Sequence, residues 1–432
     1  MHDWTAVGGW GRIIVVAVLS FLLNPLHYVA TTLIIWDLIR NIRAERAWFG
    51  IRVTRIVKPL IIRYLKASLV GLLGSILLLA LGVSVSWQSV LLVACVAIVA
   101  GAVRGRFASS AVAISVVLTL AFVAHWLPSG EQSHLANVIS FLQGISTRSW
   151  LLIAVVTCLS ELFLQWWNQR DAVFPALVTS KRGRSIGALK IQLGFVTPLV
   201  VWMTPVQHIS LNLHAGFKPW LLSPHASVAI CVLPVVFGIH GLFTALRPER
   251  VLVQWRWWNL IYAALFVSGF AILQWTNSRY GLIVAPLFIV LNECIRSIWR
   301  HVDMATEPLC APDARGVMIL YTIRGSLSER LGLRPGEVVT HVNQTPVHTA
   351  FDLHFAFEQN AAYAKFQVID ERGETRLVGN PVYEGERHQL GLLVAPEDKL
   401  ALSLKRPLGF LETLYLRRHK QAMHSFEESA SL

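Results

Sequence analysis

Long apolar runs separated by short basic connections fill the first 300 residues of the chain. A helix needs about 20 mostly apolar residues to cross a bilayer, whose hydrocarbon core is about 30 Å thick. With this length as a ruler, the pattern predicts eight or nine transmembrane helices. They are placed at residues 13–38, 68–87, 88–103, 107–127, 150–166, 191–209, 226–246, 257–275 and 281–295.

The first of these segments leaves the count open, because Asn24-Pro25 lies in its middle and a proline removes a helix hydrogen bond. It is either one kinked crossing or a re-entrant piece followed by a crossing. Later prolines favour ordinary kinks over the broken helices of transporters, since no inverted repeat is visible. These are Pro198, Pro205, Pro234 and Pro286.

Basic residues are concentrated in alternate connections, and such residues remain on the cytoplasmic side of a membrane. This bias predicts a cytoplasmic position for those connections and for the C-terminal region. The opposite connections contain only Arg148, Lys218 and Arg279. The basic set is Arg40, Arg43, Arg46, Arg52, Arg55, Lys58, Arg63, Lys66, Arg104, Arg106, Arg170, Lys181, Arg182, Arg184, Lys190, Arg247, Arg250, Arg256, Arg296 and Arg300.

Composition agrees with a multi-pass membrane protein. Of the 432 residues, 54% are hydrophobic and only 15% are charged, whereas soluble proteins carry about a quarter charged residues. The net charge of +13 does not indicate nucleic-acid binding, because the basic residues flank apolar segments. Four of the five cysteines lie in apolar stretches without CxxC spacing, which favours buried thiols over disulfides or a metal site.

From residue 313 the pattern changes to short strands and capped helices. Strands are predicted at 316–323, 337–342, 364–370, 375–380 and 389–394, and a capping box at Thr349–Asp352 predicts a helix to about residue 359. The fold prediction is an α-helical polytopic membrane domain (8–9 transmembrane helices) plus a small C-terminal α+β domain. Its parts are a membrane domain (1–300), a linker (301–312), the α+β domain (313–396) and a basic tail (397–432).

The segment GVMILYTIRGSLSERLGLRPGEVVTHVNQTPVHTAFDL resembles the bacterial PDZ consensus of HtrA-type and site-2 proteases. Residues 331–337 (LGLRPGE) and Val342-Asn343 carry most of the likeness. The chain departs from the consensus at Leu331, Glu337 and Gln344, where Ala, Asp and Gly are usual. The resemblance implies an α+β PDZ-like domain.

PDZ domains bind extended peptides by adding them to a sheet edge beside a helix. Residues 389–394 (QLGLLV) resemble the carboxylate-binding loop of that family, which implies a circularly permuted module. The implied peptide-binding residues are Leu390, Gly391, Leu392, Leu393, Phe351 and Phe355. The alternative is that residues 390–394 form only a core strand and the groove is vestigial.

This hypothesis makes Gly391→Val a natural test. We expect the added side chain to block a ligand while costing the fold little beyond about 1 kcal/mol. Arg376, expected on a solvated strand, serves as the neutral control.

No catalytic residue, metal site or cofactor is predicted. The chain has neither the HExxH motif of a metalloprotease nor the GxSxG elbow of a serine hydrolase. His240 stands alone in sequence, and His208 and His214 do not have helical i, i+4 spacing. An intramembrane protease is therefore disfavoured.

Ionisable residues within the predicted spans favour structural pairing over transport. Asp37 is expected to pair with Arg40 and Glu293 with Arg296. Glu161 is expected to bridge helices or to reach the membrane interface. The others are His27, His125 and His240. The basic loop 41–66 and the segment 400–420 are expected to lie on the inner leaflet or to bind a partner.

The whole arrangement resembles the MinJ-type cell-division topological determinants of Gram-positive rods. The likeness rests on the N-terminal NPLHY segment, the basic Arg43-Ala-Glu-Arg46 stretch, the repeated spans and the terminal PDZ-like domain. It implies a membrane adaptor without enzyme activity that bridges the polar protein DivIVA to MinD of the MinCD inhibitor, restricting FtsZ assembly to mid-cell. It also implies a plasma-membrane location enriched at septum and poles, contact with lipid, and a possible homo-oligomer.

Two other function classes remain open on the sequence. One is an accessory protein whose PDZ-like domain presents substrates to a separate membrane protease or secretion system. The other is a small-molecule transporter with a regulatory PDZ-like domain.

Overall fold

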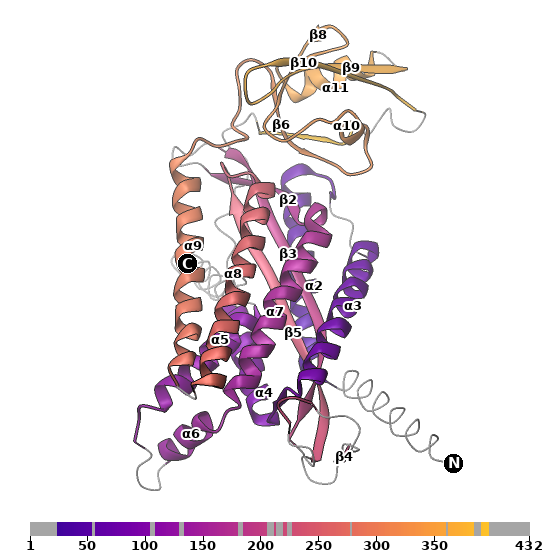
Figure 1. Ribbon diagram of the computed structural model, residues 1–432. Coiled ribbons are helices and arrows are strands. Elements are labelled where there is room, and N and C mark those ends of the chain that lie inside the picture. Colours follow the sequence, from indigo (N-terminus) through magenta and orange to yellow (C-terminus); the bar gives the residue numbers. More distant parts are fainter. Residues whose placement is uncertain are drawn as a thin grey trace, which may run out of the picture.

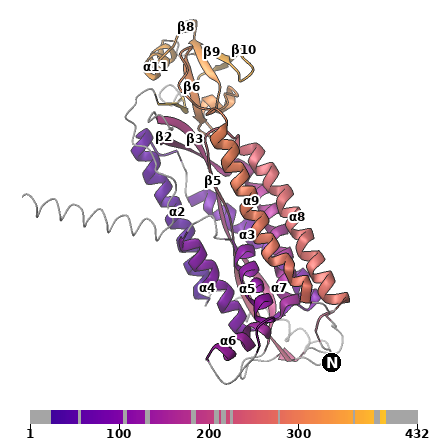
Figure 2. The same cartoon turned by 90° about the vertical axis from the view of Figure 1, so that its left-hand side faces the viewer.

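The computed structural model describes residues 24–53, 57–103, 109–128, 134–179, 185–204, 211–212, 219–222, 227–276, 279–359, 362–383 and 390–396. Figure 1 shows a long bundle of helices around two extended strands, with a small sheet domain seated on one end. The view turned by 90° shows the same end-on arrangement (Figure 2).

Four of the described helices are long and apolar enough to cross a membrane, fewer than the eight or nine crossings predicted. They coincide with the predictions near 68–87, 150–166, 257–275 and 281–295. They are α3 (Val57–Leu81), α7 (Thr147–Asn168), α8 (Pro248–Trp275) and α9 (Val284–Ala305), which the 3-10 turn η3 (Arg279–Ile283) precedes.

The helices α4 (Trp87–Val103) and α5 (Ser110–Ala124) have 17 and 15 residues and are too short to count among these crossings. The Ser110 hydroxyl accepts a hydrogen bond of 2.8 Å from the backbone N–H of Val236, which lies midway along β5 (Ser227–Phe243). Figures 1 and 2 place both helices in the half of the bundle away from the sheet domain. The crossings predicted at 88–103 and 107–127 are thus a helical pair that covers only part of the bundle's length, followed by α6 (His134–Gln143).

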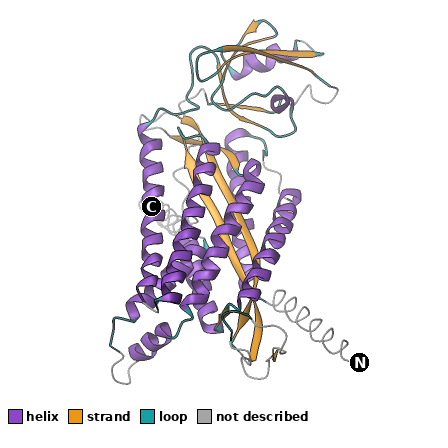
Figure 3. Ribbon diagram, in the orientation of Figure 1, coloured by secondary structure: helices purple, strands orange, loops and turns teal. Residues whose placement is uncertain are grey.

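Two predicted transmembrane helices were wrong, because the described residues of 191–209 and 226–246 form strands. The strands β3 (Ser185–Met203) and β5 pair antiparallel, from Leu189 opposite Phe243 to Met203 opposite Ala229. Their many β-branched residues suit a pleated strand better than a helix. Because both faces of these strands carry apolar side chains, apolar and polar residues do not alternate along them. The sequence therefore lacked the pattern by which a strand is recognised. Figure 3 shows these strands running lengthwise between the helices.

The prolines expected to kink helices here occupy matched positions of the hairpin, with Pro198 opposite Pro234. The backbone N–H groups of Val200 and Trp202 point away from β5, since they donate to Ser75 Oγ and Val83 O. Pro198 lies two residues before Val200, and backbone direction alternates along a strand, so an N–H at position 198 would also point away from β5. The same holds for Pro234, which lies opposite Pro198. Proline is tolerated at such edge positions, and a membrane interior makes an unpaired donor costly.

Asn24-Pro25 begins a helix and does not kink one. The Asn24 side chain caps α2 (Pro25–Phe49) by accepting from the N–H of Leu26 at 3.0 Å, and it also donates to Val232 O on β5 at 2.9 Å. The remainder of that predicted crossing, residues 13–23, lies outside the described residues. The predicted basic loop 41–66 is largely helical, because α2 continues to Phe49 and α3 begins at Val57.

Short strands extend the hairpin at both ends. At the end beneath the sheet domain, β2 (Val173–Thr179) pairs with the start of β3, after the 3-10 turn η2 (Gln169–Asp171). At the other end, β1 (Ser84–Val85) pairs with β3 and β4 (Leu211–Asn212) pairs with β5.

The C-terminal domain is an antiparallel sheet of order β10-β9-β7-β6-β11, with β8 added to β7, and the predicted strands and helix are confirmed. The elements are β6 (Val317–Thr322), α10 (Leu327–Arg330), β7 (Val338–Val342), β8 (Thr345–Pro346), α11 (Ala350–Glu358), β9 (Tyr363–Ile369), β10 (Thr375–Pro381) and β11 (Leu392–Val394).

The turn between β7 and β8 places Asn343 and Gln344 at φ values of 48° and 71°. Asparagine tolerates this left-handed region, but a glutamine side chain is strained there. Gln344→Gly is therefore expected to stabilise the protein by about 0.5–1 kcal/mol. Thermal unfolding in detergent measures the shift.

The matched control is Thr345→Gly, one residue further on in β8, where the backbone does not need glycine. It should lower the unfolding midpoint, since glycine weakens a strand. A lower midpoint for Gln344→Gly would show that the turn is not strained.

Candidate functional site

The strand β11 lies at one end of the C-terminal sheet and pairs only with β6 among the described strands. Gly391 O accepts from Ile323 N at 2.7 Å, and Ala395 N donates to Met318 O at 2.9 Å. Because hydrogen-bonding direction alternates along a strand, Leu392 and Val394 turn their backbone N–H and C=O groups away from β6. This edge can accept a further strand.

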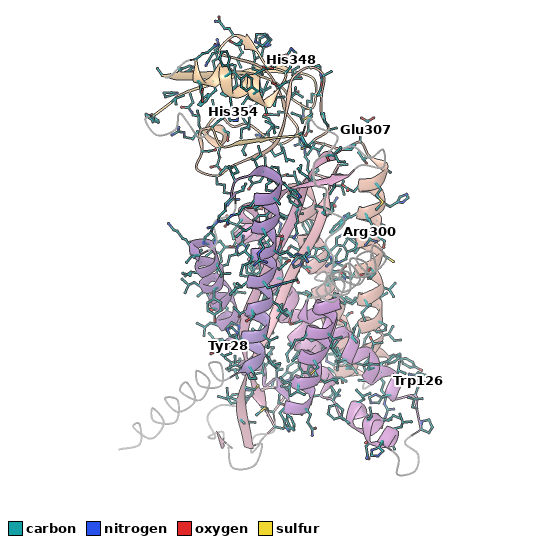
Figure 4. The ribbon with its side chains drawn as sticks, turned by 180° about the vertical axis from the view of Figure 1, so that it is seen from behind. Tyr28, Trp126, Arg300, Glu307, His348 and His354 are labelled. Atoms are coloured by element: carbon teal, nitrogen blue, oxygen red, sulfur yellow. The ribbon has the colours of Figure 1, made fainter. Side chains whose placement is uncertain are left out.

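The helix α11 presents two exposed aromatic rings one turn apart. Phe351 and Phe355 are 76% and 56% exposed, and their rings are stacked at 6.3 Å with 12° between the planes. The capping box predicted at Thr349 and Asp352 is present and fixes the start of this helix. Figure 4 labels His354 on the C-terminal domain and Glu307 where the chain leaves α9.

One hydrophobic cluster joins α11 to β11. Leu353 and Phe357 of the helix pack in the cluster that holds Leu390, and Leu392 and Val394 pack against it. The exposed aromatic pair and the outer edge of β11 therefore belong to two elements that share one core.

The predicted groove residues have different environments. Phe351 and Phe355 are exposed and Leu392 is half-buried, whereas Leu390 and Leu393 are only 2% and 7% exposed. Leu393 points away from the domain core and packs in a cluster with β2 and β3 of the helical region.

Gly391 has φ +71°, and an added Cβ would lie 2.2 Å from Ser326 Cβ. The expectation that Gly391→Val would cost the fold little was therefore wrong, because the substitution strains the backbone and collides with α10's N-cap. Arg376 lies on the partly exposed strand β10, as expected, but its side chain is tied to the fold. Its guanidinium donates to both carboxylate oxygens of Glu337 at 2.7 Å and to Gly332 O at 2.8 Å.

The sequence analysis missed the serines that hold the start of β11. Ser328 N donates to Leu390 O at 3.1 Å, and Ser328 Oγ donates to Gly391 O at 2.8 Å. The only sequence signal was the Ser-Leu-Ser run that opens α10. It gave no indication that Ser328 bonds to a residue 63 positions later in the chain.

Ionisable residues of the helical region pair with neighbouring side chains. Asp37 lies 3.2 Å from His240 Nε2 and 3.9 Å from Arg40, so the expected partner is the more distant one. Lys190 donates to Asn41 at 2.6 Å, and Gln192 donates to Asp37. These contacts form a polar seam between α2 and the hairpin.

Glu161 accepts from Trp255 Nε1 of α8 and from Gln165 Nε2, each at 3.0 Å, which confirms the predicted bridge between helices. His125 Nδ1 lies 2.6 Å from Ala121 O in its own helix. Within the described ranges, no group of three His, Cys, Asp or Glu side chains could hold a metal ion.

Comparison with known proteins identifies related chains. The chain is 27% identical over 398 residues to the cell division topological determinant MinJ of Bacillus subtilis (strain 168), covering 90% of this chain and 97% of that protein. This chain is therefore similar to MinJ over nearly its whole length.

Two further relatives of this chain carry the name probable cell division topological determinant MinJ. They come from Lacticaseibacillus paracasei and Lacticaseibacillus casei (strain BD-II), and each is 24% identical over 246 residues. Each match covers 56% of this chain and 64% of the relative. No family model matches this chain.

Gly391→Ala is expected to destabilise the C-terminal domain by about 1–3 kcal/mol, because a Cβ at positive φ adds strain to the collision with Ser326. Ser326→Gly removes the colliding atoms. The double variant should therefore recover part of the loss, which a double-mutant cycle of thermal unfolding measures. Strict additivity would contradict the collision.

Proposed function

We propose that this chain is a membrane-anchored adaptor in septum placement whose C-terminal PDZ-like domain binds an extended segment of its protein partners. Two observations carry the proposal: the outer backbone edge of β11, and the exposed Phe351–Phe355 pair on α11, which shares a core with β11. Strand addition supplies main-chain hydrogen bonds to any sequence, and side-chain pockets supply selectivity.

The aromatic pair suits a partner with apolar side chains. Two stacked rings offer a wide apolar surface at low entropic cost, since each ring turns about only two side-chain torsions. No charged group is needed at this surface. The ligand is therefore an extended segment with apolar residues directed at α11.

The MinJ resemblance supports the identity of the partners. On this proposal, the adaptor links a DivIVA-like polar protein to a MinD-like protein of the division inhibitor, and so limits FtsZ assembly to mid-cell. Either partner can use the groove, while the other binds elsewhere on the cytoplasmic face.

The arrangement of basic residues supports a cytoplasmic position for the C-terminal domain. Lys58 and Arg63 lie in the first turns of α3, and Arg247 and Arg250 lie at the start of α8. Arg247 forms an ion pair with Glu371 of the C-terminal domain. The basic ends of these helices thus share one end of the bundle with that domain, as the positive-inside rule requires of a cytoplasmic face.

Reporter fusions test the orientation. A fusion at Ala311, next to the C-terminal domain, is expected to report the cytoplasm, and one at Ser223 the opposite side. The same compartment for both would contradict the proposed topology.

Phe355→Ser is expected to weaken partner binding by about tenfold or more, because it removes an exposed aromatic ring from the groove wall. The unfolding midpoint should hardly change. Partner recovery from cells and thermal unfolding give the two measurements.

Leu377→Ser is the matched control, since Leu377 is 62% exposed on β10 at the far edge of the sheet. Equal loss of binding in both variants would place the partner outside the groove.

A fluorescent fusion of the full chain tests the cellular role. Enrichment at septum and poles supports the division adaptor, whereas a uniform membrane signal favours a protease accessory or a transporter.

A further inference from the structure

The C-terminal domain rests on an apolar floor at the end of the helical region. We define the floor by Leu177 and Leu189 of β2 and β3 and by Cys310 of the connection, and Leu320 and Leu393 of the C-terminal domain pack on it; all five are at most 7% exposed. Trp48, Phe49 and Val53, at and beyond the end of α2, pack against it.

Polar contacts surround the floor. Tyr321 Oη donates to Val173 O at 3.2 Å, Arg324 pairs with Asp171, and Arg247 pairs with Glu371. The connection itself is bonded to the hairpin end, through Leu309 N to Thr244 O at 2.8 Å and Gly187 N to Cys310 O at 3.0 Å.

The groove strand is part of this interface. Successive side chains of a strand point to opposite faces, so Leu392 and Val394 pack on the domain core while Leu393 packs on the floor. The three-residue strand β11 pairs with one strand, is bonded through Ser328 just before its start, and has Leu393 on the floor. Its position therefore depends in part on the helical region below it.

We propose that docking of the C-terminal domain on the floor and peptide binding at β11 are coupled. The docked helical region holds β11 in its binding conformation, and a bound peptide in turn holds the domain on the floor. The inference rests on the proposed function in one respect, that β11 is the peptide-binding edge.

Coupling of this kind is reciprocal, so each event must favour the other by the same factor, typically about 5- to 150-fold. The affinity of the adaptor for its partner would then depend on the conformation of its own membrane region. A change that lifts the domain would release its partner, and an arriving partner would seat the domain.

A substitution at Gly187 can separate the two regions without touching the proposed groove or the core of the C-terminal domain. A Cβ there would lie 2.5 Å from Leu320 Cδ1 and 2.8 Å from Cys310 Cβ. Gly187→Val should lift the domain, and valine suits the strand in which it sits. Gly144→Ala is the control, because its added Cβ meets only ordinary contacts of 3.4 Å or more.

Cys310 reports docking directly. It is 1% exposed, and burial raises the pKa of its thiol to about 12 despite a hydrogen bond from Gly336 that lowers it. In the full chain in nanodiscs, with the other four cysteines replaced by alanine, maleimide should label Cys310 slowly and Gly187→Val should accelerate labelling. The double variant Arg324→Ala and Glu371→Ala loosens the same interface without steric change. If neither variant accelerates labelling, docking does not depend on the floor and the proposal fails.

Amide hydrogen exchange of the same samples tests, without a ligand, whether docking orders β11. Gly187→Val is expected to speed exchange at residues 392–395 by about fivefold or more, the lower end of usual couplings. Residues 366–368 of β9, away from the floor, should not change. Unchanged exchange at 392–395 with accelerated Cys310 labelling would overturn the proposal.

The probe for binding is a fluorescent decapeptide with a free carboxylate and apolar residues at its last and third-last positions. Its affinity should fall by a similar factor in Gly187→Val and not in Gly144→Ala, and it should slow Cys310 labelling of the unsubstituted chain. Equal affinity for docked and lifted forms would overturn the coupling. No binding to the unsubstituted chain would instead count against the proposed function, and the exchange arm would still decide whether docking orders β11.

Discussion

Inside a bilayer, every backbone N–H and C=O must find its partner within the protein, and this requirement governs the β3–β5 hairpin. The two strands satisfy one another along most of their length. Their outer edges are served by the hydroxyls of Ser75 and Ser110 and the amide of Asn24. Pro198 and Pro234 reduce the need, because they carry no donor at all.

Close helix packing follows from the same requirement. A Cβ on Gly71 of α3 would lie 2.4 Å from Pro198 O, so only glycine lets this helix approach the strand so closely. On the other face of the hairpin, Ile34 of α2 lies against Gly194 of β3. The helices therefore enclose a hairpin whose edges lipid could not satisfy.

The hairpin also determines where the C-terminal domain sits. Its end, widened by β2, carries Leu177 and Leu189 and meets Leu320 and Leu393 from above. A domain joined by a free linker would sample many orientations. This one is held against the helical region by apolar burial and by hydrogen bonds of its connection.

Local signals predicted most of the C-terminal domain from sequence alone. The Thr349–Asp352 capping box, the Asn343-Gln344 turn and the alternating strands are interactions between residues close in the chain, and the structure shows all of them. The apolar crossings at α3, α7, α8 and α9 were also predictable, because length and hydropathy suffice for them.

Other features depended on residues far apart in the chain. The strands β3 and β5 have apolar side chains on both faces, so only their pairing distinguishes them from helices. The sequence likewise predicted that Arg376 lies on a solvated strand and that Gly391→Val costs the fold little, yet Glu337 and Ser326 lie against these two residues. Composition and local pattern determined the four long apolar helices and the strands of the C-terminal sheet. Only the tertiary structure decided the hairpin and the floor, because backbone pairing and close contact between distant segments leave no periodic trace in the sequence.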